Sequence, residues 1–345
     1  TGPVREAFRT ASGVYAFQGL PGLRTVEYPT HNGGSTSPPV GQRFVVAVED
    51  QQRRFLPVVL RVDAPFTGIY PTALAASPPG EALPGFSVIV YGQVFRPTSL
   101  TFGPDGRLYV GSTNAVVYAL EDTNGDHRAD VTSTFVSGVM VPLGLLWLDD
   151  QLYVSYNAKG DGRVTAFSDR DGDGRAETTD SILTGLPSNG RHQNDDLVFG
   201  PDGYIYLGMG STCDVCVEAD SRSAGILRFK PDGSDLSVFA RGLRNPYGLA
   251  FDSAGQLFAT DNGRDDLGRD APPEELNHIV AGGDYGWPDC YVGATDPACA
   301  TRQAPITTFP PRSSADGLTF YNADGFPEPY RGDAFVAVLG SYVYI

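Results

Sequence analysis

Short runs of alternating apolar and polar residues recur along the chain, and each is broken by a tight turn. The best copies are FGPDGRLYVG, WLDDQLYVSY, FGPDGYIYLG and FDSAGQLFAT, and they begin at Phe102, Trp147, Phe199 and Phe251; a looser copy surrounds Phe320. An apolar period of two predicts half-buried β-strands. Asp-Gly and Pro-Asp-Gly predict hairpin turns, because glycine accepts positive φ and proline presets the first turn position. No segment shows a long apolar period of 3.6, so helices should be few and short.

The spacing of these copies predicts the fold. Successive copies start 45, 52, 52 and 69 residues apart. A period of about 50 residues with four strands per unit is typical of β-propeller blades. Equivalent strands of a propeller start at one mouth of the central channel, and the loops there carry function. The predicted fold class is therefore all-β, with a β-propeller over residues 85–345.

Residues 1–80 have a different composition. They lack the repeat and are rich in proline and glycine, but three strand-like runs begin at Ser12, Arg43 and Phe55. These runs predict a small β-sandwich that serves as an accessory or mounting domain. The segment also faintly resembles sandwich domains encoded with contractile phage-tail-like particles, which would imply an assembly partner bound through residues 1–80. An ordinary accessory sandwich is the alternative.

Charge and cysteine content restrict the function classes. The net charge of −16 argues against nucleic acid and against an anionic membrane surface as partners. No apolar run of 18 residues is present, so no membrane span is predicted. Two close pairs, Cys213 with Cys216 and Cys290 with Cys299, predict disulfides and a secreted, periplasmic or extracellular protein, with a zinc site built from all four as the alternative. The chain lacks a starting Met and a signal peptide, so we expect a processed or trimmed chain.

Two chemically able side chains occupy equivalent positions of neighbouring repeats. His192 lies seven residues before Phe199, and Arg244 lies seven residues before Phe251. Histidine titrates near neutral pH, so His192 is a candidate general base. Arg244 is a candidate stabiliser of developing negative charge. Alternatively, Arg244 pairs with Asp261 or Asp265 and only locks its blade.

These residues also carry a family resemblance. His192, Arg244-Asn245-Pro246, Asn262-Gly263-Arg264 and the run GGDYGWP over residues 282–288 resemble the soluble sugar dehydrogenases that depend on pyrroloquinoline quinone (PQQ). The likeness covers residues 85–345 and is nearest to the sorbosone and aldose dehydrogenase branch.

The resemblance implies a six-bladed propeller that oxidises a sugar or related aldehyde, with PQQ and Ca²⁺ as cofactors and an electron acceptor as partner. It also implies that Arg244 and Asn245 contact the cofactor and that the backbone carbonyls of Gly263 and Arg264 hold calcium. About five repeats are visible, so the last blade is either incomplete or completed by the N-terminal segment. Arg191 stands where some family members carry an acid beside the catalytic histidine.

A second metal site is predicted away from the mouth. Asp169, Asp171, Asp173 and Asp180 stand at positions 1, 3, 5 and 12 of DRDGDGRAETTD, with Gly174 at position 6, as in an EF-hand calcium loop. A similar loop begins at Asp122 and lacks the glycine. An ordinary hairpin turn is the alternative for both.

Other functions stay open. A non-catalytic propeller could bind a glycan or a protein, as a displayed component of an extracellular or contractile-injection-type assembly. A lactonase-like hydrolase would require a carboxylate cluster in the channel. The run PPEELNHI, which contains His278, is predicted to form a short helix.

Overall fold

The computed structural model describes the side chains of residues 90–338, except Arg269 and residues 324–329. It also describes the backbone of residues 87–89 and of five earlier strands. These are β1 (Phe8–Thr10), β2 (Gly13–Tyr15), β3 (Leu23–Val26), β4 (Gln42–Glu49) and β5 (Phe55–Val62). The predicted sandwich of residues 1–80, and with it the phage-particle likeness, lies for the most part outside the described residues, and the likeness has no support.

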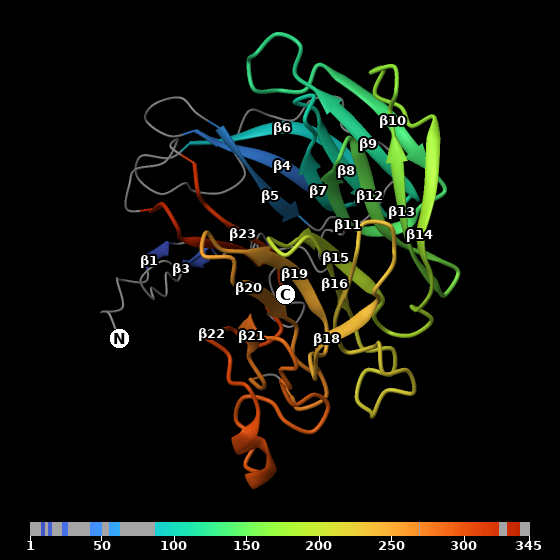
Figure 1. Cartoon of the computed structure of the whole chain (residues 1–345). Coiled ribbons are helices and arrows are strands. Elements are labelled where there is room, and N and C mark those ends of the chain that lie inside the picture. The colour runs from blue at the N-terminus through green and yellow to red at the C-terminus, as the bar shows by residue number, and fades with distance from the viewer. Residues whose placement is uncertain are drawn as a thin grey trace.

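Four sheets of four antiparallel strands follow one another along the chain (Figure 1). The first contains β7 (Pro97–Phe102), β8 (Leu108–Ser112), β9 (Val116–Glu121) and β10 (Val131–Ser137). The second contains β11 (Met140–Leu148), β12 (Gln151–Ala158), β13 (Asp161–Ser168) and β14 (Thr178–Pro187). The third contains β15 (Asn194–Phe199), β16 (Ile205–Met209), β17 (Gly225–Phe229) and β18 (Ser237–Arg241). The fourth contains β19 (Pro246–Phe251), β20 (Leu257–Asp261), β21 (Glu274–Ile279) and β22 (Thr307–Phe309).

Two three-stranded sheets and the antiparallel pair of β1 with β2 contain the remaining described strands. β23 (Ala315–Phe320) pairs with β24 (Ala334–Val338), and β24 pairs in parallel with β3. β6 (Ser87–Phe95) forms the other sheet with β4 and β5. The propeller is confirmed, but the described residues give four complete four-stranded blades rather than six. The proposed division into two domains stays a prediction.

The first strand of each blade lies on the inside. β7, β11, β15, β19 and β23 contact one another in that order, so they surround the channel. Glycines make this approach close: a Cβ on Gly248 would lie 2.1 Å from the carbonyl oxygen of Asp316. Because all five strands run in the same sense, the segments that precede them meet at one mouth of the channel.

The hydrophobic core lies between the faces of neighbouring blades. The largest cluster joins the second and third blades through fully buried Ile205, Leu207, Leu227 and Phe229. Two of the repeated aromatic residues serve this packing. Trp147 lies 4.9 Å from the ring of Tyr109 in the preceding blade, and Phe251 lies 5.3 Å from the ring of Tyr206. Two of the four repeated aromatic positions, Trp147 and Phe251, thus contact the preceding blade, whereas Phe102 and Phe199 are exposed.

Both predicted disulfides are present, Cys213–Cys216 and Cys290–Cys299, so the alternative zinc site is excluded for these cysteines. Helical segments among the described residues are short, as predicted, and the longest is the 3₁₀ turn η1 (Pro297–Thr301). The helix predicted around His278 is wrong: this residue lies in β21, the third strand of its blade, because pairing with β20 and β22 overrides the local preference. Nowhere in the described residues is there a helix with the length and apolar composition that spanning a bilayer requires.

Candidate functional site

His192 and Arg244 each stand two residues before an inner strand, β15 and β19 respectively. The backbone around Ser211 connects them: Ser211 N donates to the Arg244 carbonyl (2.7 Å), and His192 N donates to the Ser211 carbonyl (3.1 Å). Gly210 allows this approach, since a Cβ there would lie 2.3 Å from the His192 Cβ and 2.6 Å from Asn245 Oδ1. The structure thus brings His192, Arg244 and Asn245 together at one mouth.

His192 is held in its neutral form. Burial, followed by the nearby positive charge of Arg244, lowers its pKa to about 4, so the ring is neutral at neutral pH. Its Nδ1 lies 3.0 Å from the Ser211 carbonyl, which can only accept a hydrogen bond. Nδ1 therefore carries the proton in the neutral ring, and Nε2 keeps the free lone pair.

Arg244 is buried, with 4% of its side chain exposed, and all its donors are engaged. Nε and Nη2 both contact Asp214 Oδ1, at 3.1 and 2.6 Å, and Nη2 also reaches Asp265 Oδ2 at 3.2 Å. Nη1 donates to the carbonyls of Asn262 (3.1 Å) and Gly263 (2.7 Å). Of the two acids that the sequence offered as alternative partners, Asp265 pairs with the Arg244 side chain, whereas Asp261 accepts the backbone N–H of Arg244.

Asp261 fixes the backbone of Arg244 and Asn245. Its two carboxylate oxygens accept the backbone N–H groups of Arg244 (3.0 Å) and Asn245 (2.6 Å). Glu274 accepts the N–H of Gly263 in the same way. Burial raises the pKa of Asp261 to about 6 and that of Glu274 to about 8. The mouth is thus built on buried acids whose charged forms are disfavoured.

Several polar atoms at the mouth lack a protein partner. Asn245 Oδ1, Asn262 Oδ1 and Trp287 Nε1 are buried and make no hydrogen bond to the described residues. The Trp287 ring lies 5.8 Å from the Arg244 guanidinium and 5.9 Å from that of Arg264. The two amide oxygens can accept a hydrogen bond or bind a cation, the Trp287 N–H can donate one, and the aromatic ring beside two guanidinium groups fits a planar ligand.

The space beside Arg244 is narrow. A cleft of about 20 Å³ is lined by Arg244, Gly263, Arg264, Glu275, Trp287 and Tyr291, among others. Drug-sized ligands fill roughly 300–1,000 Å³. The cleft is therefore far smaller than a ligand of that size.

The predicted calcium seat at Gly263 and Arg264 is only partly compatible with these contacts. The Gly263 carbonyl already accepts Arg244 Nη1, so a calcium ion would share this oxygen with a guanidinium. The Arg264 side chain turns to Asp266 (2.6 Å) and to the Pro288 carbonyl (3.3 Å). Calcium at these carbonyls stays a prediction.

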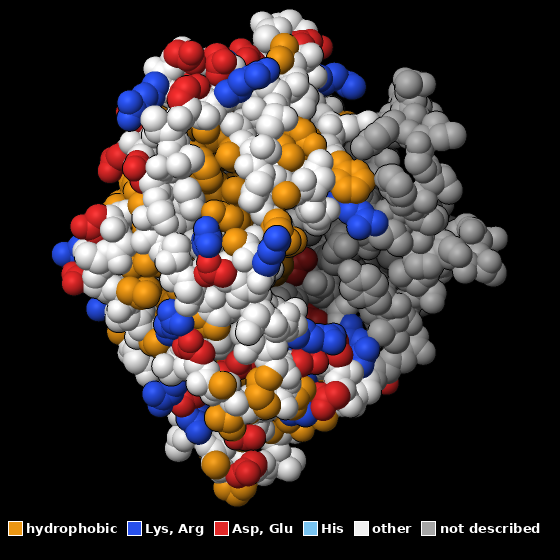
Figure 2. Space-filling view, turned by 90° about the vertical axis from the view of Figure 1, so that its right-hand side faces the viewer, with side chains coloured by type: hydrophobic (Ala, Val, Ile, Leu, Met, Phe, Trp, Pro, Cys, Tyr) orange, Lys and Arg blue, Asp and Glu red, His pale blue; other side chains and the backbone are white. Residues whose placement is uncertain are grey.

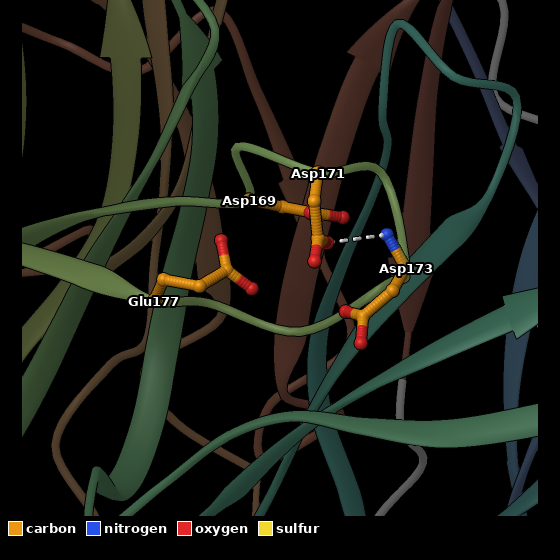
Figure 3. A group of neighbouring side chains, drawn as sticks. All are labelled: Asp169, Asp171, Asp173 and Glu177. Atoms are coloured by element: carbon orange, nitrogen blue, oxygen red, sulfur yellow. Dashed lines mark hydrogen bonds between the residues drawn. The ribbon is translucent and has the colours of Figure 1, made fainter.

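The acidic loop of the second blade gathers a slightly different set of residues from the one predicted. The carboxylates of Asp169, Asp171, Asp173 and Glu177 lie within 4.8 Å of one another (Figure 3). Glu177, rather than Asp180, is the fourth member; Asp180 lies in β14 and accepts Gln151 Nε2 at 3.0 Å. Gly172 and Gly174 donate their N–H groups to Asp169, as expected for a tight acidic turn. Metal binding by this loop stays a prediction.

On the face shown in Figure 2, charged side chains of both signs are mixed among the described residues. The charged residues that matter at the mouth are buried or paired. Asp214 and Ser211 were missed in the sequence, and the signal that could have found Asp214 is its position inside the Cys213–Cys216 ring.

The propeller fold and the residues at its mouth can be compared with those of known proteins. The PQQ-bound aldose sugar dehydrogenase of Streptomyces coelicolor is 26% identical, with a TM-score of 0.53, over 64% of this chain and 70% of that one. Quinoprotein glucose dehydrogenase B of Acinetobacter calcoaceticus is 30% identical over 31% of this chain and 28% of its own length. Aldose sugar dehydrogenase YliI of Escherichia coli K12 is 24% identical over 55% of this chain and 58% of its own. The chain thus spans less than two thirds of these two curated relatives. The resemblance to PQQ-dependent sugar dehydrogenases is confirmed.

Residues 111–339 match a family described as a domain of unknown function, DUF7133, and the chain belongs to that family.

Proposed function

We propose that this protein is an oxidoreductase that oxidises a sugar, or a related aldehyde or hemiacetal, with PQQ and Ca²⁺ as cofactors. The observation that carries the proposal is the neutral His192, with Nδ1 on a carbonyl, next to the buried cation Arg244. The names of the relatives support the reaction class and the cofactor.

His192 has the role of general base. Its Nε2 takes the proton of the anomeric hydroxyl while the C–H electron pair leaves as hydride, and the C–O bond becomes a carbonyl. When bound, PQQ with calcium supplies the acceptor for the two electrons. Arg244 contributes a fixed positive charge that stabilises negative charge developing beside it. Asn245 and Asn262 offer unpaired amide oxygens that orient a polar ligand.

The setting fits an oxidising compartment. Two disulfides close the loops that flank the mouth, which supports a periplasmic or extracellular protein. The electron acceptor belongs to the same proposal, with a small diffusible acceptor as the simplest choice.

The test is a reconstitution of the purified protein. PQQ and CaCl₂ are added, and aldose-dependent reduction of a dye acceptor is followed. We expect activity that requires the sugar and PQQ and falls when calcium is chelated. PQQ binding without oxidation of any aldose would contradict the enzyme proposal and favour a propeller that binds a glycan or a protein.

A further inference from the structure

Two guanidinium groups and two carboxylates form one cluster at the mouth. Asp214 bridges Arg244 (Nη2, 2.6 Å) and Arg191 (Nε, 3.4 Å), and Asp265 bridges the same two arginines at 3.2 and 3.4 Å. Arg244 is almost fully buried, whereas Arg191 is 54% exposed. The buried member of the pair is therefore the stronger anion receptor, because its charge is less screened by water.

Every N–H of Arg244 is used by the protein itself. A guanidinium has five N–H donors, and Arg244 directs them to Asp214, Asp265, Asn262 O and Gly263 O. Nε and one N–H of Nη2 form the edge that binds carboxylates and other anions in a bidentate way. Asp214 Oδ1 occupies that whole edge. An anionic group of a ligand can reach it only by displacing Asp214.

The chain holds Asp214 in this place by covalent and polar restraints. Asp214 lies inside the four-residue ring closed by Cys213–Cys216 and has a positive φ of 68°, a conformation that Asp tolerates better than most residues. Glu218 fixes the base of the ring, because it accepts hydrogen bonds from the Ser211 hydroxyl and from the hydroxyl and N–H of Thr212. The ring thus keeps one carboxylate against Arg244.

We propose that Asp214 is an internal anion that occupies the Arg244 edge and competes with the anionic groups of the ligand, so that the Cys213–Cys216 ring sets the affinity of the site. The inference rests on the proposed function, since it takes PQQ as the ligand. The narrow cleft beside Arg244 agrees with a site closed by its own side chains. Asp214 is here an affinity-setting residue and takes no part in the chemical step.

The first test is the substitution Asp214→Asn, which keeps the shape and removes the charge. PQQ is titrated into the apo protein and its dissociation constant is measured by tryptophan fluorescence, without sugar or turnover. We expect binding that is roughly tenfold tighter, the effect of losing one competing charge-assisted contact. Asp220→Asn is the matched control, because Asp220 lies on the same loop but pairs with Arg222. It should leave the affinity unchanged.

The Asp214→Asn substitution can also contradict the inference. If Asp214 instead holds Arg244 in position for the ligand, Asp214→Asn should weaken PQQ binding, and unchanged or weaker binding would overturn the inference. The double variant Cys213→Ser with Cys216→Ser opens the ring. Provided that its melting temperature shows a folded protein, it should bind PQQ more tightly, as Asp214→Asn does.

A second probe separates this inference from the proposed function. Oxalate, a small dianion, is added to the wild type and to Asp214→Asn, and the rise in melting temperature is compared at low salt. A larger rise in the variant supports a vacated anion site even if PQQ binds neither protein, in which case only the proposed function fails. Equal shifts in both proteins, without tighter PQQ binding in the variant, would reject the internal anion.

Discussion

The inner strands β15 and β19 have two ends that differ in chemistry, although one repeat builds both. At the hairpin end, polar groups are satisfied within a few residues: Asp202 accepts the Tyr206 hydroxyl at 2.8 Å, and Asp105 accepts the Tyr109 hydroxyl at 2.7 Å. In the fourth blade Asp252 accepts the N–H groups of Ala254 and Gln256. Each turn is thus a self-contained unit.

At the mouth, polar groups are satisfied by segments far apart in the chain. Arg244 contacts Asp214, thirty residues earlier, and Arg191 contacts Asp265. Charges are buried, carboxyl pKa values are raised, and some amide oxygens have no partner among the residues that the structure describes. At the hairpin end, the repeated residues stabilise the fold. At the mouth, the residues that depart from the repeat form the candidate site.

The sharpest test of this comparison is His192→Ala. Turnover of the reconstituted enzyme should fall by roughly 10²–10⁴-fold, the range for loss of a general base. PQQ affinity should hardly change, because Arg244 and Asn245 remain. Steady-state kinetics and a PQQ titration measure the two effects separately. His278→Gln, a histidine of β21 outside the mouth, is the control, and a similar loss there would contradict the role given to His192.

Arg244→Met should cause the largest loss of stability. It leaves Asp214, Asp265 and two carbonyls without their common partner, and breaking a buried ion pair costs roughly 3–5 kcal/mol. Because Asp214 and Asp265 are partly exposed, we expect the lower end of this range. Urea denaturation gives the value. The exposed pair of Arg222 with Asp220 provides the control, since Arg222→Met should cost roughly 1 kcal/mol or less.

The raised pKa of Glu274 predicts how stability depends on pH. Its folded-state pKa of about 8 exceeds the ordinary value of 4.5, so its contribution is fully present below pH 4.5 and is lost as the pH rises through 8. Glu274→Gln should remove this part of the pH dependence of stability, on the order of a few kcal/mol between these limits.

His192 acts in the opposite sense, because its pKa is lowered from 6.5 to about 4 and its contribution to stability is lost as the pH falls between these values. Melting curves from pH 4 to 9 test both, and an unchanged slope in Glu274→Gln would contradict the burial effect.

Substitutions at the hairpin end should have the smallest effects on stability and turnover. Asp202→Ala removes the bond from the Tyr206 hydroxyl and should cost about 1 kcal/mol without changing turnover. Asp105→Ala in the first blade should behave alike, because Tyr109 makes the same contact. If Asp202→Ala abolished activity, the division between a structural end and a chemical end would not hold.

Much of the fold could be predicted from the sequence because its signals are local. The turn residues and the period-two runs place the hairpins near Phe102, Trp147, Phe199 and Phe251. Trp147 and Phe251 become contacts between blades. The close spacing of Cys290 and Cys299 was sufficient for their disulfide. One prediction was wrong where tertiary pairing decides. The run around His278 is a strand. Of the six blades that the resemblance implied, the described residues give four complete four-stranded sheets.

For the site, the sequence by itself determined that His192 and Arg244 occupy equivalent places, because strands of one repeat start at one mouth. Only the tertiary structure decided what these side chains contact. The pairing of Arg244 with Asp214, the carbonyl on His192 Nδ1, and the replacement of Asp180 by Glu177 in the acidic loop all depend on distances of a few ångströms. A sequence repeat determines the position of a residue only to within one strand. Hydrogen bonds and ion pairs need side chains from distant loops to meet at 2.6–3.4 Å, and packing of the blades sets that approach.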